Sequence, residues 1–263
     1  MPLAKLGDIN INYRVEGTGD PLVMVMGFSA SMIGWHYQTQ FFRKHYRVIT
    51  FDNRGVGKSD KPKGPYTTRM MADDTVHLMD HLGIEKAHIM GASMGGMIAQ
   101  ELAINHPERV NKLVLACTYS KQDRTSGINP EMVELSQLPP EKMATNVINS
   151  SFNKPLYRFF FGPLSRLNSM FMGASSSIGI KGQSAACMTH NTLERLESIT
   201  ADTLVIVGTD DRLINPVSSE VIASRIPRAK IVKIEGGSHT FMVEMRDDFN
   251  REVLKFLSNG HAS

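Results

Sequence analysis

The sequence predicts an α/β protein whose mostly parallel sheet is covered by helices on both faces. Two strand-length apolar runs, residues 22–26 and 204–207, contain no polar residue. Such runs are typical of strands that are buried on both faces. Segments with apolar residues at helical spacing lie between the strands, and glycine-rich loops follow several of them. Repeated strand–helix units of this kind favour a parallel sheet.

The expected elements alternate along most of the chain. Residues 9–15 alternate apolar and polar side chains, which indicates an edge strand. In residues 68–82, Met71, Thr75, Leu78 and Leu82 fall on one face of a helix. The other expected strands are residues 22–26, 46–51, 87–90, 110–117, 203–207 and 229–234. The other expected helices are residues 33–44, the segment that follows Ser93, and residues 217–226 and 249–257.

The alternation stops between residues 119 and 198, where apolar residues take helical spacings and no convincing strand is found. We therefore predict a core formed by residues 1–118 and 199–263 and a helical cap formed by residues 119–198. Residues 173–182 are expected to be a flexible connector within the cap. Met and Phe side chains of the cap would form its own core, line an apolar pocket, or do both. They are Met132, Met143, Phe152, Phe159, Phe160, Phe161, Met170, Phe171, Met172 and Met188.

Composition and charge exclude several classes of protein. A chain of 263 residues is long enough for one domain with an insertion. The net charge of +3 is dispersed and includes no basic run, so we expect no nucleic-acid partner. No apolar run approaches the ~18 residues of a membrane span. The sequence leaves the oligomeric state open.

The cysteines and the first residues predict a cytoplasmic location. Cys117 and Cys187 are the only cysteines, and free thiols suit a reducing compartment. Residues 1–20 lack a basic region followed by an apolar one, so no secretory signal is expected. No His, Cys and Asp residues have metal-ligand spacing, and Asp52 stands where a phosphate-binding loop ending at Lys58 and Ser59 would need glycine. We therefore expect no metal and no cofactor.

A G-x-S-x-G signature lies where a predicted strand meets a predicted helix. It is formed by Gly91, Ser93 and Gly95 with the residues between them. A strand–turn–helix of this type strains the backbone of the central serine and exposes its hydroxyl at the carboxyl edge of the sheet. Ser93 is therefore the candidate nucleophile.

A serine hydroxyl needs a base, and that base needs an orienting group. His239 follows the last predicted strand, in the sequence Gly-Gly-Ser-His, and is the candidate base. Reactive groups gather beyond the carboxyl ends of parallel strands. The loop after the preceding strand offers two adjacent carboxylates, Asp210 and Asp211, which cannot both point at one imidazole.

A developing oxyanion needs two preorganised N–H donors. The backbone N–H of Met94 follows the serine at the start of the helix. The loop after residues 22–26 should supply the other, from Phe28.

Four motifs together make the chain resemble the α/β-hydrolase superfamily from end to end. They are Asp52-x-Arg54-Gly55-x-Gly57-x-Ser59, Gly91-x-Ser93-x-Gly95-Gly96, Gly208-x-x-Asp211 and Gly237-Ser238-His239. The resemblance implies a sheet of about eight strands and a helical cap. It also implies the chain order Ser93, Asp211, His239 for a catalytic triad, and favours Asp211 over Asp210 by the spacing from Gly208 and Pro216.

Within the superfamily the chain is similar to bacterial carboxylesterases, 3-oxoadipate enol-lactonase-like proteins and cofactor-free perhydrolases. Trp35, Gln40 and Gly64-Pro65-Tyr66 add to this similarity, and Met26 departs from it because many relatives carry histidine there. A serine nucleophile argues against haloalkane dehalogenases and epoxide hydrolases, which use aspartate.

The expected function is hydrolysis of small or medium apolar carboxylic esters through an acyl-enzyme. The same triad would serve lactone, C–C bond or thioester hydrolysis and peracid formation. A carboxylate-bearing lactone would need a cation over the site, for which Arg158 and Arg166 are candidates. A ligand receptor that retains the triad and turns over slowly is the alternative of another class.

Overall fold

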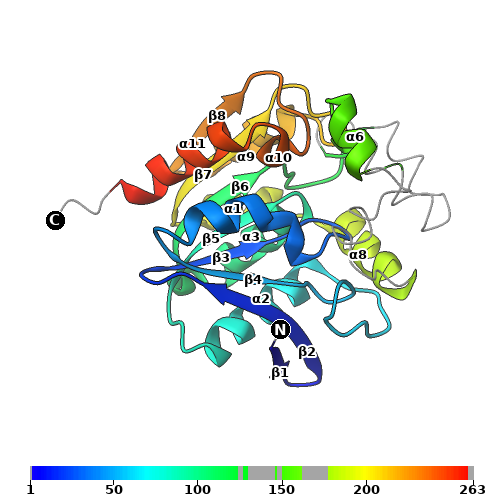
Figure 1. Cartoon of the computed structure of the whole chain (residues 1–263), viewed down its shortest axis with the longest axis vertical. Coiled ribbons are helices and arrows are strands. Elements are labelled where there is room, and N and C mark those ends of the chain that lie inside the picture. The colour runs from blue at the N-terminus through cyan, green and yellow to red at the C-terminus, as the bar shows by residue number, and fades with distance from the viewer. Residues whose placement is uncertain (1, 124–126, 130–145, 147–149, 162–176, 260–263) are drawn as a thin grey trace.

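The computed structural model describes residues 2–123, 127–129, 146, 150–161 and 177–259. At its centre is an eight-stranded sheet in the order β1-β2-β4-β3-β5-β6-β7-β8, shown in Figure 1. The strands are β1 (Leu3–Leu6), β2 (Ile9–Glu16), β3 (Pro21–Val25), β4 (Arg47–Phe51), β5 (Ala87–Ala92), β6 (Val110–Ala116), β7 (Asp202–Gly208) and β8 (Ala229–Ile234). Strand β2 pairs antiparallel with both of its neighbours, β1 and β4, and the other pairs are parallel. The predicted fold class is confirmed.

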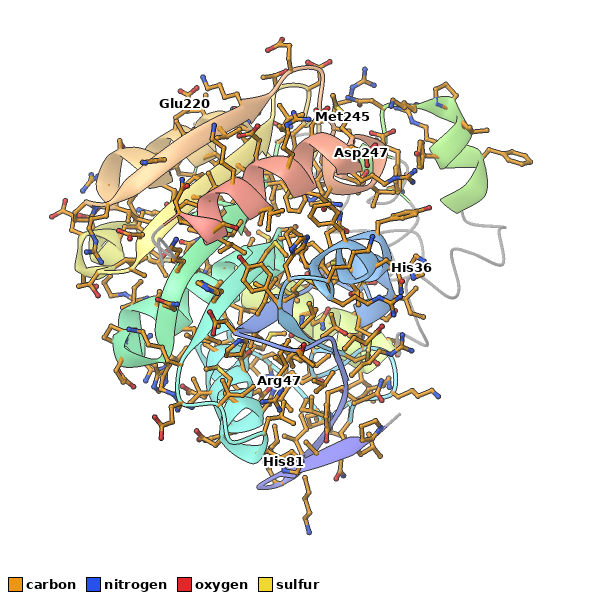
Figure 2. The ribbon with its side chains drawn as sticks, turned by 60° about the vertical axis from the view of Figure 1, so that its left-hand side comes forward. His36, Arg47, His81, Glu220, Met245 and Asp247 are labelled. Carbon is orange, nitrogen blue, oxygen red and sulfur yellow. The ribbon has the colours of Figure 1, made fainter. Side chains whose placement is uncertain are left out.

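Helices cover both faces of the sheet. The longer ones in the core are α1 (His36–Phe42), α2 (Thr68–His81), α3 (Met94–Asn105), α9 (Val217–Arg225) and α11 (Arg246–Ser258). The short ones are η1 (Met32–Trp35), η2 (Pro107–Arg109), η3 (Leu193–Ser198) and α10 (Phe241–Glu244). Helices α1 and α11 pack together on one face, near the labelled residues His36 and Met245 in Figure 2. On the other face α2 packs on α3, and α9 packs on η3.

Alternating side chains of each central strand pack into two apolar clusters, one on each face of the sheet. In β3, Leu22 and Met24 belong to the apolar cluster under α1 and α11, whereas Val23 and Val25 belong to the cluster under α2 and α3. Successive side chains of a strand point to opposite faces, so a strand covered on both sides must be apolar throughout. The uninterrupted apolar runs of the sequence follow from this burial.

Two helices of the predicted cap lie beside the carboxyl ends of the strands, on the right in Figure 1. They are α6 (Pro155–Phe161) and α8 (Ser177–Thr189). The expected connector at 173–182 is wrong from residue 177 onward, because Ser177 begins α8. Glycine and serine content suggested flexibility there, but the glycines of α8 serve close packing on the core.

Three further boundaries differ from the sequence prediction. Strand β1 was not predicted, because four residues at the edge of a sheet give little periodic signal. The helix expected over 33–44 is divided into η1 and α1. The last helix begins at Arg246, several residues before the expected start at 249. In the described part of the chain, every helix is too short or too polar to cross a bilayer.

The loop after β4 is built around the buried carboxylate of Asp52. One oxygen accepts from Met32 N at 2.8 Å, and the other accepts from Asn12 Nδ2 at 2.7 Å and Lys58 N at 2.9 Å. Three donors satisfy a charge that would otherwise be costly to bury. This network orders the loop that holds Asn53 and Arg54. The partly buried Arg54 forms an ion pair with Asp74, in which Nε lies 2.5 Å from Oδ2.

Replacement of Gly95 by alanine tests the close approach of α3 to β3. Alanine normally stabilises a helix by about 1 kcal/mol relative to glycine. At Gly95, however, a Cβ would lie 2.0 Å from Val25 O, which is backbone. We expect Gly95→Ala to lower the free energy of unfolding by about 1–3 kcal/mol in urea titrations.

Gly83→Ala is the control for that measurement. Gly83 has a φ of +64° and nothing within 4 Å of its Cβ position, so alanine there costs backbone strain alone. A Gly95→Ala protein as stable as the unmodified one would contradict the close approach.

Candidate active site

The backbone at Ser93 is strained and held in place from two sides. Ser93 lies between β5 and α3 with φ 56° and ψ −123°, a region that residues other than glycine rarely occupy. Its N–H donates to Ala116 O at 2.9 Å, and Thr118 Oγ1 donates to its carbonyl at 2.8 Å. A Cβ at Gly91 would lie 2.2 Å from Gly95 O, so the turn requires glycine there. The sequence motif thus forms a tight strand–turn–helix.

Asp211 and His239 form a buried hydrogen-bonded pair. His239 Nδ1 lies 2.8 Å from Asp211 Oδ2, with side-chain exposures of 7% and 0%. The other carboxylate oxygen accepts from the backbone N–H groups of Leu213 and Ile214, each at 2.9 Å. A carboxylate fixed in this way holds the imidazole in one orientation. Nδ1 donates to it, and Nε2 is left as the ring nitrogen that can accept a proton.

Asp210 lies outside this pair. Its side chain is exposed, while its backbone N–H donates to Gly237 O at 2.9 Å and its carbonyl accepts from Asn153 Nδ2 at 3.2 Å. The structure therefore brings Asp211, and not Asp210, to the imidazole of His239. Residue spacing alone left the choice between Asp210 and Asp211 open, whereas the hydrogen bond to His239 distinguishes them.

The loop of the predicted oxyanion donor passes directly over the serine. A Cβ at Gly27 would lie 3.1 Å from Ser93 Cβ and 3.6 Å from its Oγ. Phe28 follows and lines the same cavity as Ser93. Met94 is the first residue of α3. The two predicted donors thus come from two segments that adjoin Ser93, the loop after β3 and the start of α3.

The loop of His239 is bonded to the segment of the predicted cap that precedes α6. Thr240 Oγ1 donates to Ser151 O at 2.7 Å. The buried carboxylate of Glu244 accepts from Ser238 Oγ and from Lys154 N, the latter at 2.7 Å. The segment that leads into α6 and the loop that carries the imidazole are therefore held together.

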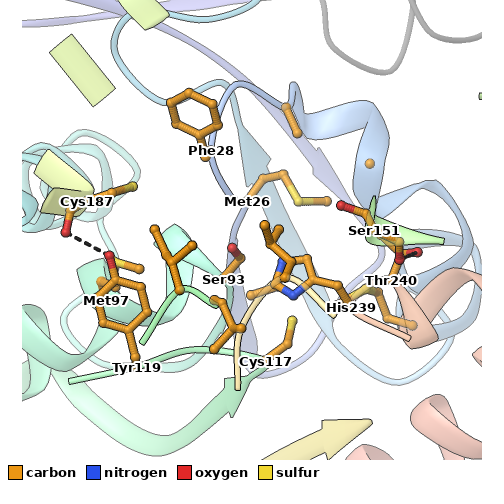
Figure 3. Close-up of a pocket in the computed structure, with 18 of the residues that line it drawn as sticks. Met26, Phe28, Ser93, Met97, Cys117, Tyr119, Ser151, Cys187, His239 and Thr240 are labelled. Carbon is orange, nitrogen blue, oxygen red and sulfur yellow. Dashed lines mark hydrogen bonds between the residues drawn. The ribbon is translucent and has the colours of Figure 1, made fainter. Parts of the chain in front are cut away.

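Ser93 and His239 reach one largely apolar cavity of about 140 Å³, shown in Figure 3. Its wall includes the side chains of Met26, Phe152 and Met242. Two of its hydroxyls already have partners, since Tyr119 OH donates to Cys187 O at 2.8 Å and Thr240 Oγ1 to Ser151 O. Among the described lining residues, none is a lysine, arginine, aspartate or glutamate. The cavity therefore suits an uncharged, apolar group.

Comparison with known proteins identifies the family of this chain. Residues 20–244 match the family model described as the alpha/beta hydrolase fold. The chain belongs to this family.

Named relatives cover nearly the whole chain. The "Putative non-heme bromoperoxidase BpoC" of Mycobacterium tuberculosis is 33% identical over 95% of this chain and 98% of its own length. The "Putative carbamate hydrolase RutD" of Azorhizobium caulinodans is 28% identical, with coverages of 97% and 98%. The enol-lactonase of Burkholderia xenovorans superposes with a TM-score of 0.87 at 26% identity, over 98% of this chain and 100% of that one. The family and these names indicate a hydrolase.

The methionine and phenylalanine residues predicted for the cap divide into three groups. Phe152 and Met188 line the cavity, whereas the side chain of Phe159 is 79% exposed. The others lie outside the described residues, as do the side chains of Phe160 and Phe161 within α6. Of the two candidate cations, Arg158 donates from Nε to Phe152 O at 2.6 Å and does not line the cavity. Arg166 lies outside the described residues.

Another buried histidine, His190, lies outside the group formed by Ser93, Asp211 and His239. His190 contacts Thr68 Oγ1 through Nδ1 at 2.9 Å and Thr192 Oγ1 through Nε2 at 3.3 Å. Thr192 in turn donates to Gln100 Oε1 at 2.6 Å, so its oxygen accepts from His190. Burial lowers the pKa of His190 to about 4, because the charged ring would lose its hydration. This network is satisfied by a neutral imidazole.

The pH dependence of stability tests the neutral state of His190. Its folded pKa lies below the ordinary 6.5, so the unfolded chain binds the proton first as the pH falls. Its contribution is therefore complete above pH 6.5 and is lost between pH 6.5 and 4. We expect this loss to approach about 1.4 kcal/mol per pH unit, measured as the difference between the unmodified protein and His190→Gln in urea titrations. His45→Gln, at an exposed histidine, is the control, and a parallel pH dependence for the unmodified protein and His190→Gln would refute the assignment.

Proposed function

We propose that this hydrolase cleaves small to medium apolar carboxylic esters through an acyl-enzyme on Ser93. One observation supports the proposal above the others: a strained serine and a carboxylate-oriented imidazole, from segments far apart in sequence, reach the same apolar cavity. These are the parts that acyl transfer by a serine requires. The name of one structural relative, an enol-lactonase, also supports ester chemistry, since an enol-lactone is a cyclic ester.

In the proposed reaction, His239 Nε2 removes the proton of Ser93 Oγ as the oxygen attacks the ester carbonyl. The backbone N–H groups of Phe28 and Met94 bind the resulting oxyanion, and Asp211 stabilises the imidazolium. His239 then gives its proton to the leaving alcohol. Deacylation repeats these steps with water as the nucleophile. Every step uses residues of this chain, and no cofactor enters the proposal.

Substrate class follows from the wall of the cavity. Burial of an apolar acyl chain contributes about 25 cal/mol per Å² removed from water. A carboxylate would lose its hydration against the described lining without a cation in return. We therefore place neutral esters ahead of carboxylate-bearing lactones. Neutral lactones and activated C–C bonds remain alternative substrates of the same triad.

A second candidate activity is supported by the relative named as a bromoperoxidase. Hydrogen peroxide in place of water would attack the same acyl-enzyme and release a peracid, which oxidises bromide in solution. This alternative needs no residue beyond the proposed triad. Bromination of monochlorodimedone in acetate with peroxide, compared with hydrolysis of a neutral ester, ranks the two activities.

The domain division and the location accompany the function as proposals. We propose residues 119–198 as a cap over a core of residues 1–118 and 199–263. A cytoplasmic location is supported by two buried cysteines that are free thiols.

Hydrolysis of p-nitrophenyl butyrate by Ser93→Ala tests the nucleophile. Loss of the attacking oxygen should lower kcat by about 10³-fold or more, with folding unchanged by circular dichroism. A ligand receptor would instead show one stoichiometric release of p-nitrophenol without turnover in the unmodified protein. That result would reject the esterase proposal.

Two neighbouring aspartates provide a matched pair of variants. Asp211→Asn should lower kcat by up to about 10⁴-fold, since an amide in contact with Nδ1 favours the wrong imidazole tautomer. Asp210→Asn changes an exposed side chain and should stay within about threefold of the unmodified rate, as surface changes commonly do. The same kinetic assay measures both, and a greater loss in Asp210→Asn would overturn the assignment of the acid.

A further inference from the structure

The peptide that carries the proposed oxyanion donor is clamped on both sides. The Phe28 N–H belongs to the peptide between Gly27 and Phe28. The preceding peptide is held by Asn53 Nδ2, which donates to Met26 O at 2.8 Å. The following peptide is held through Ser29 N, which donates to Gln183 Oε1 at 2.7 Å. A peptide between two fixed neighbours has little freedom to rotate.

The two clamps come from different parts of the fold. Asn53 belongs to the loop after β4, whereas Gln183 belongs to α8 of the proposed cap. Gln183 is 1% exposed, and its Nε2 donates to Arg54 O at 2.8 Å. Both ends of its amide are therefore used, one on each core loop. Ser29 has a φ of 62°, an unfavourable value for serine that this bond helps to maintain.

Helix α8 is seated on the core by direct backbone contact. A Cβ at Gly179 would lie 1.9 Å from Gly55 O, and a Cβ at Gly182 would lie 2.5 Å from the Tyr66 ring. Two glycines one helical turn apart thus let the helix touch the loop that holds Arg54. This contact fixes the position from which the next residue, Gln183, reaches Ser29.

We propose that Gln183 is a positioning residue for the oxyanion hole, through which the seating of α8 sets the orientation of the Phe28 N–H. The inference rests on the proposed function, because it assumes that Phe28 donates to the oxyanion. Gln183 does not line the cavity and acts through the loop. A donor that is held in advance stabilises charge that develops only in the transition state. Loss of the clamp should therefore lower kcat and leave KM nearly unchanged.

Gln183→Met tests the proposal by removing both hydrogen bonds while preserving length. With p-nitrophenyl butyrate, we expect kcat to fall by about 10-fold or more and KM to change by less than about threefold. A trifluoromethyl propyl ketone supplies the second readout. Ser93 Oγ adds to its carbonyl carbon and forms a covalent bond. The serine proton moves to His239, and the carbonyl π electrons move to the oxygen, which becomes an oxyanion. Methyl propyl ketone binds without this addition.

The ratio of the two inhibition constants isolates oxyanion stabilisation. In Gln183→Met, the preference for the trifluoromethyl ketone over methyl propyl ketone should fall by about the same factor as kcat, both relative to the unmodified protein. Gln183→Glu keeps an oxygen for the Ser29 N–H and should retain more of that preference. Gln183→Asn is too short to reach both partners and repeats the test if the methionine protein does not fold.

Gln100→Met is the matched control. Gln100 is also a fully buried glutamine with two partners, since it accepts from Thr192 and donates to Tyr119 O at 3.1 Å. Its loss should lower the melting temperature and leave the ratio of inhibition constants unchanged. An unchanged ratio in folded Gln183 variants would overturn the inference. If Ser93→Ala were also fully active, the proposed function itself would fail, so the two failures are distinguishable.

Discussion

The close approach of backbones around Ser93 is the constraint on which the site depends. A serine at φ 56° persists only where its surroundings fix it. Here the carbonyl of Val25 would lie 2.0 Å from a Cβ at Gly95, and that of Gly95 would lie 2.2 Å from a Cβ at Gly91. Strand β3, strand β5 and helix α3 therefore meet with no room for side chains between them. This contact places the hydroxyl and the loop of Phe28 at the same edge of the sheet.

The order of the strands in the sheet places Asp211 and His239 at the same edge. Parallel strands β7 and β8 end side by side, so the loops that follow them bring Asp211 to His239. Residues of the proposed cap also bond to loops at this edge, after β3 and after β8. Gln183 bonds to the loop after β3, and Ser151 bonds to Thr240 beside the imidazole. Described residues of the proposed cap, such as Phe152 and Met188, therefore line the cavity, and others bond to the loops beside it.

The parts predicted from sequence are those with a local physical signal. Buried strands such as β3 and β7 need uninterrupted apolar residues, and the tight turn at Ser93 needs glycine, so both are visible in the residues. The choice between Asp210 and Asp211 depends on backbone direction and required a resemblance to a known family. Gln183 lies 154 residues from its partner Ser29, and no local sequence pattern predicts their hydrogen bond. The glycines of α8 favour a flexible connector when only the sequence is considered, because glycine serves both flexibility and close packing.

Mass spectrometry of the protein after reaction with p-nitrophenyl diethyl phosphate tests the account most directly. This reagent leaves a stable phosphoryl group on an activated serine. The account predicts one diethylphosphoryl adduct, on the peptide that contains Ser93, absent in Ser93→Ala and formed far more slowly in His239→Ala. An adduct at another residue, or equal rates with and without the imidazole, would contradict it.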